Sequence, residues 1–566
     1  MDGFDETFDW VVVGSGAGSM TSALVMRQAG KSVLVLEKTG YVGGTTAKSG
    51  GVIWVPNNPL MRQAGEQDST EAGIAYLEAL AEDLPGSTPE KRRAYVVESQ
   101  KMIDFLLAQG IPLARGADFW PDYYDEVPGG CKTSRTVTAR YFNKAELGPE
   151  WAARLRPGFV SQPAMLSEGL KLAWVGRSWK IKLLLLRIGL RVIAGKLTGK
   201  QWVSAGAALQ GRLLKAVLDA GADVRIDSPV RELVIADGRV AGVIAESGGE
   251  RRRIGARLGV LINAGGFAQN QAMRDRFMPG TRAEWSNTPE GDTGDMHAEM
   301  ERIGAALGQM DQMVGYQMTR MPGWEQAFVK PPAQSLTGKP GAILVDQSGQ
   351  RYMNEGGSYE LYCQTMFERN RTVPAIPSWA IFDARFARAY PIAGVRMAKM
   401  HQAWKDSGYL KEADTIEGLA AQIGVPAEAL QATIARWNGF VDAGHDADFG
   451  RGARAYDQWL GDPFLKPHPA LARIDQAPFY AVDVVPGDVS TYGGAVTDAR
   501  ARVLRPDGSV IDGLYACGVS SASVMGGVYV GAGASIGPSL AFGYVAARHA
   551  AGLDNSLRPG LTPGGW

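Results

Sequence analysis

The sequence predicts an α/β fold, α+β for the whole chain, with a Rossmann-like nucleotide-binding domain built from both chain ends. Three strand-to-glycine junctions lead to this prediction. DWVVVGSGAGS at 9–19 is an apolar strand running into glycines, and GVLINAGG at 259–266 and GLYACG at 513–518 repeat the pattern. Since such junctions surround a nucleotide in doubly wound sheets, their spread along the chain indicates one cofactor domain with a second domain inserted into it.

The first junction has the features of a dinucleotide-binding turn. Met20–Gln28 is expected to form a helix, and Ser32–Leu36 a second strand that ends in Glu37. Gly14 and Gly16 permit a tight turn that brings backbone N–H groups to a pyrophosphate, while Glu37 is placed to accept hydrogen bonds from ribose hydroxyls. The serine that ends GSGAGS stands where a third glycine or alanine is usual, so a purely structural turn is the alternative.

A second glycine-rich loop indicates which dinucleotide is bound. YVGGTTAKSGGVIW at 41–54 carries small hydroxyl residues suited to lying along a large planar cofactor, which a nicotinamide-only enzyme would not need. The sequence therefore predicts non-covalent FAD. The residues expected to contact it are Gly14, Gly16, Ala17, Gly18, Glu37, Lys38, Gly44, Thr45, Thr46, Ser49, Gly50, Gly51, Ala264, Gly265, Gly266, Gly518, Ser535 and Ile536.

The composition excludes several other classes of protein. Fifty-nine basic and 59 acidic residues cancel, so the net charge gives no reason to expect a nucleic-acid partner. The three cysteines are far apart and in no metal-type spacing, so neither a metal site nor a structural disulfide is expected. The acidic N-terminus lacks an apolar signal region, and no apolar run reaches the ~18 residues of a membrane span. We expect a cytoplasmic protein.

Tyrosines, rather than histidines, stand in the segments expected to surround the cofactor. Flavoproteins that act on dicarboxylates need cations to bind two carboxylates, yet the five histidines of this chain lie outside the glycine-rich junctions. Tyr123 and Tyr124 occur in FWPDYYDEVPGG, Tyr359 in NEGGSYELY, and Tyr529 in the last glycine-rich loop. A phenol can donate to a ketone oxygen and, with a lowered pKa, act as a base. The sequence therefore predicts an apolar substrate that carries a carbonyl group.

The loop YVGAG at 529–533 is expected to bind an oxygen that gains negative charge. The phenol of Tyr529 and the backbone N–H of Gly533 are placed to point at one enolate oxygen, and only glycine would let the substrate approach so closely. Gly537, Pro538 and the helix that follows would direct a positive helix end at the flavin. The alternative for any buried tyrosine is a packed ring with a satisfied hydroxyl.

These motifs together carry a resemblance to a known family. GGTTAKSGG, NAGG, PDYY, QRYMNEGGSYE and YVGAGASIGPSLAFGY resemble the fumarate reductase and succinate dehydrogenase type flavoproteins, and most closely 3-ketosteroid Δ1-dehydrogenase. The likeness runs from about Trp10 to Ala550. It implies an FAD-binding domain at 1–310 and 488–566 and an inserted catalytic domain at 311–487, with boundaries uncertain by ten residues or more.

The resemblance also implies a reaction in steroid degradation. Tyr529 and Gly533 would bind the C3 ketone of a steroid such as 4-androstene-3,17-dione, and Tyr359 would remove a proton from C2. One of Tyr123 and Tyr124 would assist it, Tyr124 being preferred. FAD would take the hydride from C1 and pass it to an unidentified electron acceptor. Apolar residues ahead of the pair are expected to line the cavity: Phe119, Trp120 and Pro121.

A segment at about 170–200 departs from the family pattern. It holds eight basic residues and no acidic one between Lys171 and Lys200. As a helix it would place Arg177, Lys180, Arg187 and Arg191 on one side and Leu183, Leu186, Leu190 and Ile193 largely on the other, although Leu184 falls on the basic side. This composition predicts an interfacial helix on the anionic inner face of the cell membrane. A basic face packed on the protein's own core is the alternative.

Three other functions share some of these features. A 3-keto-5α-steroid 4-dehydrogenase would use the same flavin and a similar tyrosine pocket, and a fumarate-reductase-like enzyme is disfavoured by the scarcity of histidine. The third function is that of a membrane sensor that binds a flavin without turnover, which would not be an enzyme. The C-terminal GLDNSLRPGLTPGGW is expected to be a mobile tail.

Overall fold

The structure is a computed structural model that describes residues 3–116 and 120–553. Phe119, expected in the cavity, and the expected tail beyond residue 553 lie outside the described residues. Among the described helices, none is both long enough and apolar enough to cross a membrane.

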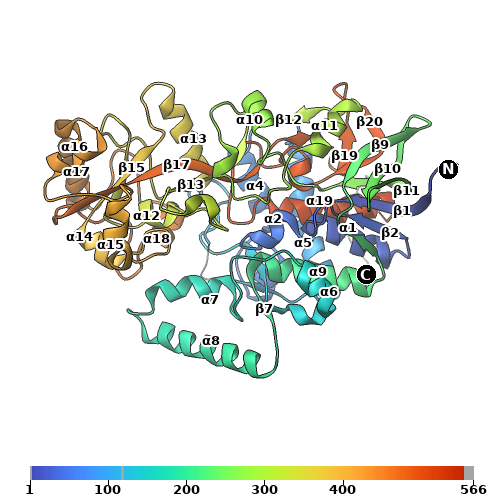
Figure 1. The fold of residues 1–566 in the computed structure, drawn as a ribbon, viewed down its shortest axis with the longest axis horizontal. Coiled ribbons are helices and arrows are strands. Elements are labelled where there is room, and N and C mark those ends of the chain that lie inside the picture. Colours follow the sequence, from blue (N-terminus) through green and yellow to red (C-terminus); the bar gives the residue numbers. More distant parts are fainter. Residues whose placement is uncertain (1–2, 117–119, 554–566) are drawn as a thin grey trace.

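An eight-stranded sheet forms the larger end of the molecule, at the right of Figure 1. Its strands are β1 (Glu6–Val13), β2 (Val33–Leu36), β8 (Asp223–Arg225), β9 (Val230–Ala236), β10 (Arg239–Ser247), β11 (Glu250–Ile262), β19 (Arg502–Leu504) and β20 (Val510–Ala516). The parallel part runs in the order β8, β2, β1, β11, β20. The late strand β20 thus pairs with β11, as the doubly wound prediction requires, and the sheet is built from both ends of the chain.

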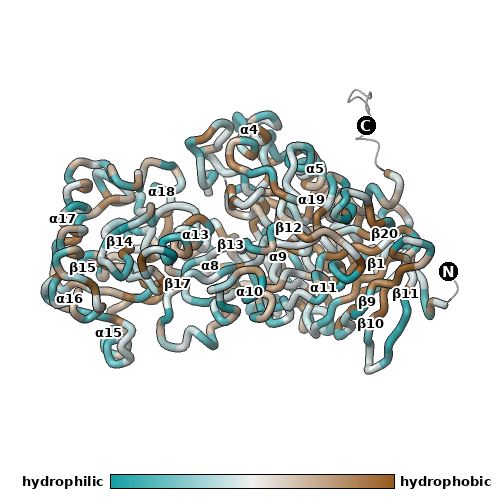
Figure 2. Tube along the Cα trace, turned by 90° about the horizontal axis from the view of Figure 1, so that it is seen from above, coloured by the Kyte–Doolittle hydropathy of each residue, from teal (hydrophilic) through white to brown (hydrophobic). Residues whose placement is uncertain are grey.

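Helices cover this sheet because its central strands are apolar on both faces. The last four residues of β1 are buried, and Figure 2 shows β1 and β11 among the more hydrophobic parts of the chain. The covering helices include α1 (Ala17–Gln28), α5 (Pro89–Ala108), α9 (Ala205–Asp219) and α19 (Ile536–Ala550). α1 and α19 touch through their backbones, since a Cβ on Gly18 would lie 2.3 Å from the Ser539 carbonyl oxygen.

A five-stranded antiparallel sheet forms the other end. It consists of β13 (Met313–Met318), β14 (Ala342–Val345), β15 (Ser378–Asp383), β16 (Lys411–Ala413) and β17 (Phe479–Thr491). Helices on it include α12 (Gln334–Thr337), α13 (Tyr359–Asn370), α14 (Ala384–Ala389), α15 (Met397–Asp406), α16 (Ile416–Ile423), α17 (Ala427–Ala443) and α18 (Ala455–Leu460). β13 pairs with β17, so the chain enters and leaves this sheet on adjacent strands. The expected domain boundaries at 310 and 487 remain a proposal.

Shorter elements connect the two ends. The small sheets are formed by β3 (Val52–Trp54), β4 (Leu113–Arg115) and β5 (Thr136–Ala139), by β6 (Phe142–Asn143) and β7 (Trp202–Val203), and by β12 (Leu307–Gly308) and β18 (Gly494–Ala495). The remaining helices are α2 (Gly44–Lys48), α3 (Pro59–Gln63), α4 (Thr70–Leu80), α6 (Gly148–Arg154), α7 (Leu166–Lys171), α8 (Trp179–Leu197), α10 (Gln271–Phe277) and α11 (Asp295–Arg302).

The basic segment forms α7 and α8, which stand away from both sheets at the lower edge of Figure 1. α8 contacts the body on one side, where Ile188 is buried. Just ahead of it, the Trp174 ring lies 6.2 Å from Tyr390, and Arg177 forms a 2.5 Å ion pair with Asp462. The segment therefore bridges to the antiparallel end of the molecule while leaving most of α8 exposed.

Candidate active site

Five tyrosine rings from distant parts of the chain meet between the two sheets. Tyr359 is at the centre: its ring centroid lies 5.5 Å from that of Tyr123, 5.2 Å from Tyr529 and 5.4 Å from Tyr316. Tyr123 also contacts Tyr456, at 4.1 Å. Tyr359 is the first residue of α13, Tyr316 lies on β13, Tyr456 on α18, and Tyr529 in the loop before α19. We call these five residues the tyrosine cluster.

Backbone contacts hold the two loops of the cluster together. The Tyr123 N–H donates to the Val530 carbonyl at 3.1 Å, and the buried hydroxyl of Tyr76 donates to the same carbonyl at 2.7 Å. The Tyr76 hydroxyl also accepts from the Tyr124 N–H, at 3.3 Å. The PDYY segment and the YVGAG loop, about 400 residues apart in the sequence, are therefore fixed relative to each other by α4.

Tyr123 rather than Tyr124 reaches Tyr359. The ring centroid of Tyr123 lies 5.5 Å from that of Tyr359 and 4.1 Å from that of Tyr456. The Tyr124 ring instead lies under the Arg454 guanidinium, 5.2 Å away. Among the described residues the ring contact with Tyr359 thus belongs to Tyr123 and not to the preferred Tyr124, because consecutive residues of this loop point in different directions, and the assisting role stays a proposal.

Burial keeps Tyr359 and its neighbours Tyr123, Tyr316 and Tyr456 protonated in the resting protein. Desolvation raises the pKa of Tyr359 well above that of a free phenol, and its neighbours Tyr123 and Tyr529 raise it further. Burial also raises the pKa of Tyr316, to about 12. A phenolate can form here only if something in the reaction lowers this cost, such as hydrogen bonds donated to the anion.

The YVGAG loop presents one phenol and one free N–H. The Tyr529 hydroxyl lies 3.2 Å from Ser535 Oγ. Gly533 has φ +93°, and its carbonyl accepts from Trp54 N and Gly537 N, whereas among the described residues its own N–H has no acceptor. A Cβ on Gly533 would lie 2.4 Å from the Val52 carbonyl oxygen. Glycine is therefore required by its packing on β3, and the approach of a substrate, expected from the sequence, stays a prediction.

The expected cofactor residues gather at one edge of the large sheet. The segment after β1 holds Gly14, Gly16, Ala17 and Gly18, and the segment after β2 holds Glu37 and Lys38. The helix α2 and the turn into β3 hold Gly44, Thr45, Thr46, Ser49, Gly50 and Gly51. The segment after β11 holds Ala264, Gly265 and Gly266, the segment after β20 holds Gly518, and α19 begins with Ser535 and Ile536. This is the carboxyl edge of the parallel strands, where nucleotides bind in such sheets.

Details of this edge fit a dinucleotide. α1 and α19 begin without a side-chain cap, which leaves N–H groups of their first turns for an anion. Glu37 accepts from Ser15 Oγ at 2.5 Å and from Thr39 N and Oγ1 at 2.9 and 2.8 Å. Because a carboxylate has about four acceptor positions, Glu37 retains one for a ribose hydroxyl.

Several of the expected cofactor residues have partners within the protein. Lys38 forms a 3.0 Å ion pair with Asp295. A Cβ on Gly265 would lie 2.3 Å from Asp292 Oδ1, and one on Gly266 would lie 2.1 Å from Thr491 Oγ1. Close packing in the protein accounts for these two glycines without a cofactor.

Sequence reasoning missed two members of the tyrosine cluster and one residue beside it. Tyr316 and Tyr456 stand in strand and helix segments with no glycine-rich junction to draw attention to them. Glu360 directly follows Tyr359, and its buried carboxyl has no hydrogen-bond partner among the described residues. The position of Glu360 directly after Tyr359, the expected base, was the one feature of the sequence that could have pointed to it.

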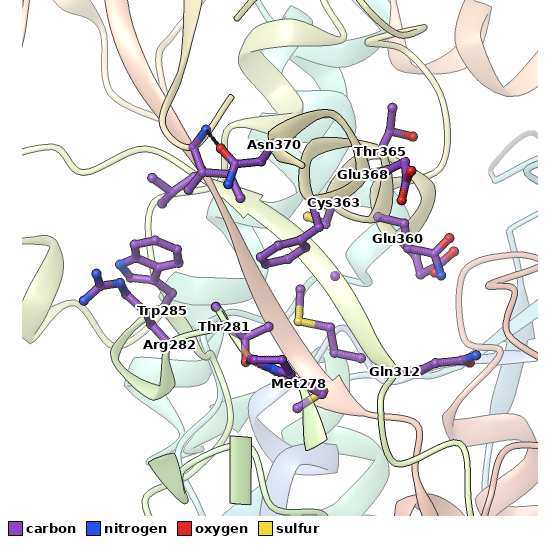
Figure 3. Close-up of a pocket in the computed structure, with 18 of the residues that line it drawn as sticks. Met278, Thr281, Arg282, Trp285, Gln312, Glu360, Cys363, Thr365, Glu368 and Asn370 are labelled. Carbon is purple, nitrogen blue, oxygen red and sulfur yellow. Dashed lines mark hydrogen bonds between the residues drawn. The ribbon is translucent and has the colours of Figure 1, made fainter. Parts of the chain in front are cut away.

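A cavity of about 1020 Å³ lies on the other side of β13 from the tyrosine cluster (Figure 3). Met313 and Gly315 line it, while Tyr316 faces the cluster, as alternation along a strand dictates. Glu360 and Cys363 of α13 also line this cavity, which we call the rear pocket.

Comparison with known proteins gives matches to a family model, to curated relatives and to a solved structure. Residues 9–536 match the family model described as FAD binding domain. The 3-oxosteroid 1-dehydrogenase of Mycobacterium tuberculosis is 38% identical, covering 96% of this chain and 98% of that protein. The crystal structure of 3-ketosteroid delta1-dehydrogenase from Sterolibacterium denitrificans in complex with 1,4-androstadiene-3,17-dione has a TM-score of 0.89 at 34% identity and covers 97% and 100% of the two chains. The 4-oxocyclohexanecarboxylate 2-dehydrogenase of Sinomonas cyclohexanicum is 34% identical, over 96% and 93%.

Proposed function

Because the chain belongs to the family of FAD-binding flavoproteins that contains the 3-oxosteroid 1-dehydrogenases, we propose that the tyrosine cluster is the catalytic centre of its reaction. The protein is an FAD-dependent oxidoreductase that introduces a 1,2-double bond into 3-ketosteroids. When bound, FAD accepts a hydride from C1. The observation that carries the assignment is the meeting of Tyr123, Tyr359 and Tyr529, the last of which shares its loop with Gly533.

Each residue of the site has a role that its position supports. The Tyr529 hydroxyl and the Gly533 N–H donate to the C3 oxygen, so that negative charge developing on this oxygen is stabilised. Tyr359 takes the proton from C2. Tyr123, whose ring lies 5.5 Å from that of Tyr359, would stabilise the phenolate once its hydroxyl turns to donate to it. Proton removal and charge stabilisation thus act on neighbouring atoms of one ring.

The walls of the site favour an apolar substrate. Trp120 and Trp459 lie 6.1 Å apart, and Trp459 stacks on Tyr456 at 5.8 Å. These rings offer a flat apolar surface beside the phenols. A steroid matches it better than a small ketone with a carboxylate, which would need a cation at the site.

Anaerobic mixing with 4-androstene-3,17-dione tests this function. We expect the flavin band to bleach and the ultraviolet spectrum to become that of a 1,4-dien-3-one. 4-Oxocyclohexanecarboxylate is the control substrate, and it should bleach the flavin far more slowly. Bleaching by succinate but not by the steroid would contradict the assignment, and formation of a 4-ene from a saturated 5α-3-ketosteroid would instead identify a 4-dehydrogenase.

We also propose that α8 rests on an anionic membrane surface. Six apolar residues on its outer side are 48 to 83% exposed: Trp179, Leu183, Leu186, Leu190, Ile193 and Leu197. They lie opposite the buried Ile188, so they do not pack on the protein's own core. Exposed Lys180, Lys182, Arg187 and Lys196 flank them. A line of apolar side chains between cations is the pattern of an interfacial helix.

A further inference from the structure

Glu360 is a fully buried carboxyl group that the proposed mechanism leaves unused. Its exposure is 0%, and among the described residues neither of its oxygens has a hydrogen-bond partner. A buried carboxyl without partners costs stability that an apolar side chain of similar size would not. Since it directly follows Tyr359 on the first turn of α13, a role in the chemistry of the neighbouring phenols would account for its presence.

One side of Glu360 faces the YVGAG loop and its neighbours. The Tyr529 backbone N–H stabilises the charged form of its carboxyl, and a charge on Glu360 acts on the phenols of Tyr124 and Tyr492 and on the Cys363 thiol. The Tyr492 hydroxyl is itself buried without a partner, and it lies within electrostatic reach of both Glu360 and Tyr529. Two unpartnered polar groups therefore stand beside the tyrosine cluster.

The other side of Glu360 lines the rear pocket. Glu360 and Gln312 lie on the same side of that pocket in Figure 3. With its unpartnered Oε1, Gln312 is the third residue here, after Glu360 and Tyr492, that has a buried polar atom without a partner among the described residues. The other charged residues around the pocket are Arg282, Glu284, Asp311, Arg320, Glu368 and Arg371. The pocket is wide enough for many water molecules, so Glu360 stands between the phenols and a space that solvent can fill.

We propose that Glu360 passes the steroid's C2 proton from the tyrosine cluster to water in the rear pocket. This inference rests on the proposed function. Once steroid binding and hydrogen bonds to the anion have made Tyr359 a phenolate, the C2–H bond breaks and the proton bonds to this phenolate, while the hydride leaves C1 for FAD. The proton then moves by way of the Tyr529 and Tyr492 hydroxyls to the Glu360 carboxylate, across water that bridges these groups because the Tyr492 hydroxyl and the Glu360 carboxyl have no direct partner among the described residues, and from there to water in the rear pocket. Tyr359 is again a phenolate and Glu360 again a carboxylate, so one proton is released per turnover.

The ionisation of Glu360 suits such a transfer. Burial raises the pKa of its carboxyl to about 8, although the Tyr529 N–H opposes the shift. A group whose pKa lies near the working pH both accepts and releases protons readily. A carboxyl with an ordinary pKa near 4.3 would hold the proton too weakly to take it from a phenol.

The substitution Glu360→Gln separates proton release from proton removal. Glutamine keeps the shape and burial of the side chain but cannot carry the proton. In a single turnover, flavin bleaching by 4-androstene-3,17-dione should stay within ~3-fold of the wild type, since Tyr359 still accepts the C2 proton. Exchange of the C2 hydrogens with D2O, measured by mass spectrometry with the flavin reduced beforehand, should slow at least ~10-fold. The rise of the exchange rate centred near pH 8 should also disappear.

Three further variants make the result decisive. Glu368→Gln, on the same helix and the same pocket, should change neither rate. Glu360→Asp retains a titratable group and should recover part of the exchange. Tyr492→Phe should slow exchange while leaving bleaching near normal. Normal exchange in Glu360→Gln, or equal losses in the Gln and Asp variants, would overturn the proposal. If the wild type itself fails to bleach with the steroid, the proposed function is what has failed.

Discussion

Tyr123 and Tyr124 are neighbours in the chain, yet it is the ring of Tyr123 that contacts those of Tyr359 and Tyr456. Tyr124 lies against Arg454. The difference arises in the loop, where the Tyr123 N–H and the Tyr124 N–H are held by separate acceptors. A single residue of backbone thus decides which phenol lies beside Tyr359, the proposed base.

Removing the hydroxyl of Tyr359 should abolish most turnover. In Tyr359→Phe the ring and its contacts remain, but the proton acceptor is gone, so the turnover number should fall at least ~100-fold. The visible spectrum of the flavin and the dissociation constant of the steroid should change little. Near-normal turnover of this variant between pH 6 and 10 would contradict its role as the base.

The two tyrosines of the PDYY pair offer a matched comparison. Tyr123→Phe removes the donor to Tyr359, and we expect turnover to fall about 10-fold, the value of one hydrogen bond of roughly 1.4 kcal/mol. Tyr124→Phe should reduce it less than ~3-fold. The ratio of turnover to KM for 4-androstene-3,17-dione measures both. The opposite order of effects would return the assisting role to Tyr124.

For single residues, the sequence predicted which residue types form the site better than it predicted the directions in which their side chains point. Tyr359, Tyr529 and Gly533 are found where motifs place them, because strand and helix ends fix those loops. The direction of Tyr124 depends on Arg454, more than 300 residues away, and no local pattern contains that information. Glu360 was overlooked because only the fold reveals that its carboxyl is buried without a partner.

In α8, too, the local sequence pattern predicts the helix, whereas contacts with distant residues determine which of its side chains are engaged. Periodicity alone predicted a helix with a basic and an apolar side. It did not predict that Arg177 pairs with Asp462 or that Arg191 pairs with Glu168, at 2.9 Å. Two of the four cations expected to face a membrane are therefore engaged by the protein itself, and the other two, Lys180 and Arg187, flank the exposed line together with Lys182 and Lys196.

Substitutions on the outer side of α8 test its membrane contact. Changing Leu186, Leu190 and Ile193 to Gln together should weaken binding to anionic vesicles on the order of 100-fold, since each side chain contributes roughly 1 kcal/mol of apolar burial. Co-sedimentation measures the change, and turnover of a soluble steroid should be retained. Met400→Gln, at an exposed apolar position on α15, is the control. Unchanged binding of the triple variant would rule out α8 as the contact.

For the whole molecule, a buried ion pair joins the two ends. Arg274 of α10 is bonded to Asp488 of β17, and the two side chains are 0% and 1% exposed. Asp488 also accepts from Ser286 Oγ at 2.6 Å. Because burial raises the pKa of Asp488 even with Arg274 present, its charge depends on this partner.

Loss of Arg274 should destabilise the protein as a whole. In Arg274→Met an uncompensated carboxylate remains buried, and the free energy of unfolding should fall by about 3–5 kcal/mol. Denaturation in urea, followed by tryptophan fluorescence, measures it. Arg276→Met on the same helix removes only an exposed pair with Glu301 and should cost no more than about 1 kcal/mol. Equal effects of the two substitutions would refute a special role for the buried pair.

The large sheet was predictable from the sequence because each of its strand-to-glycine junctions is local. Val260 and Leu514 pair side by side, as the two late junctions suggested. The antiparallel sheet was not predicted in detail, since its strands are joined by long helical excursions and their pairing depends on contacts that no short motif records.

The pairing of β20 with β11 has a consequence for how this protein is made. Every strand of the antiparallel sheet lies between 313 and 491, so that part is synthesised before β20. Until β20 and α19 are synthesised, β11 lacks one of its neighbours, and a free strand edge of this kind is prone to wrong pairing. The part of the molecule that begins first is therefore completed last, and the edge where the expected cofactor residues gather stays incomplete until β20 and α19 have joined it.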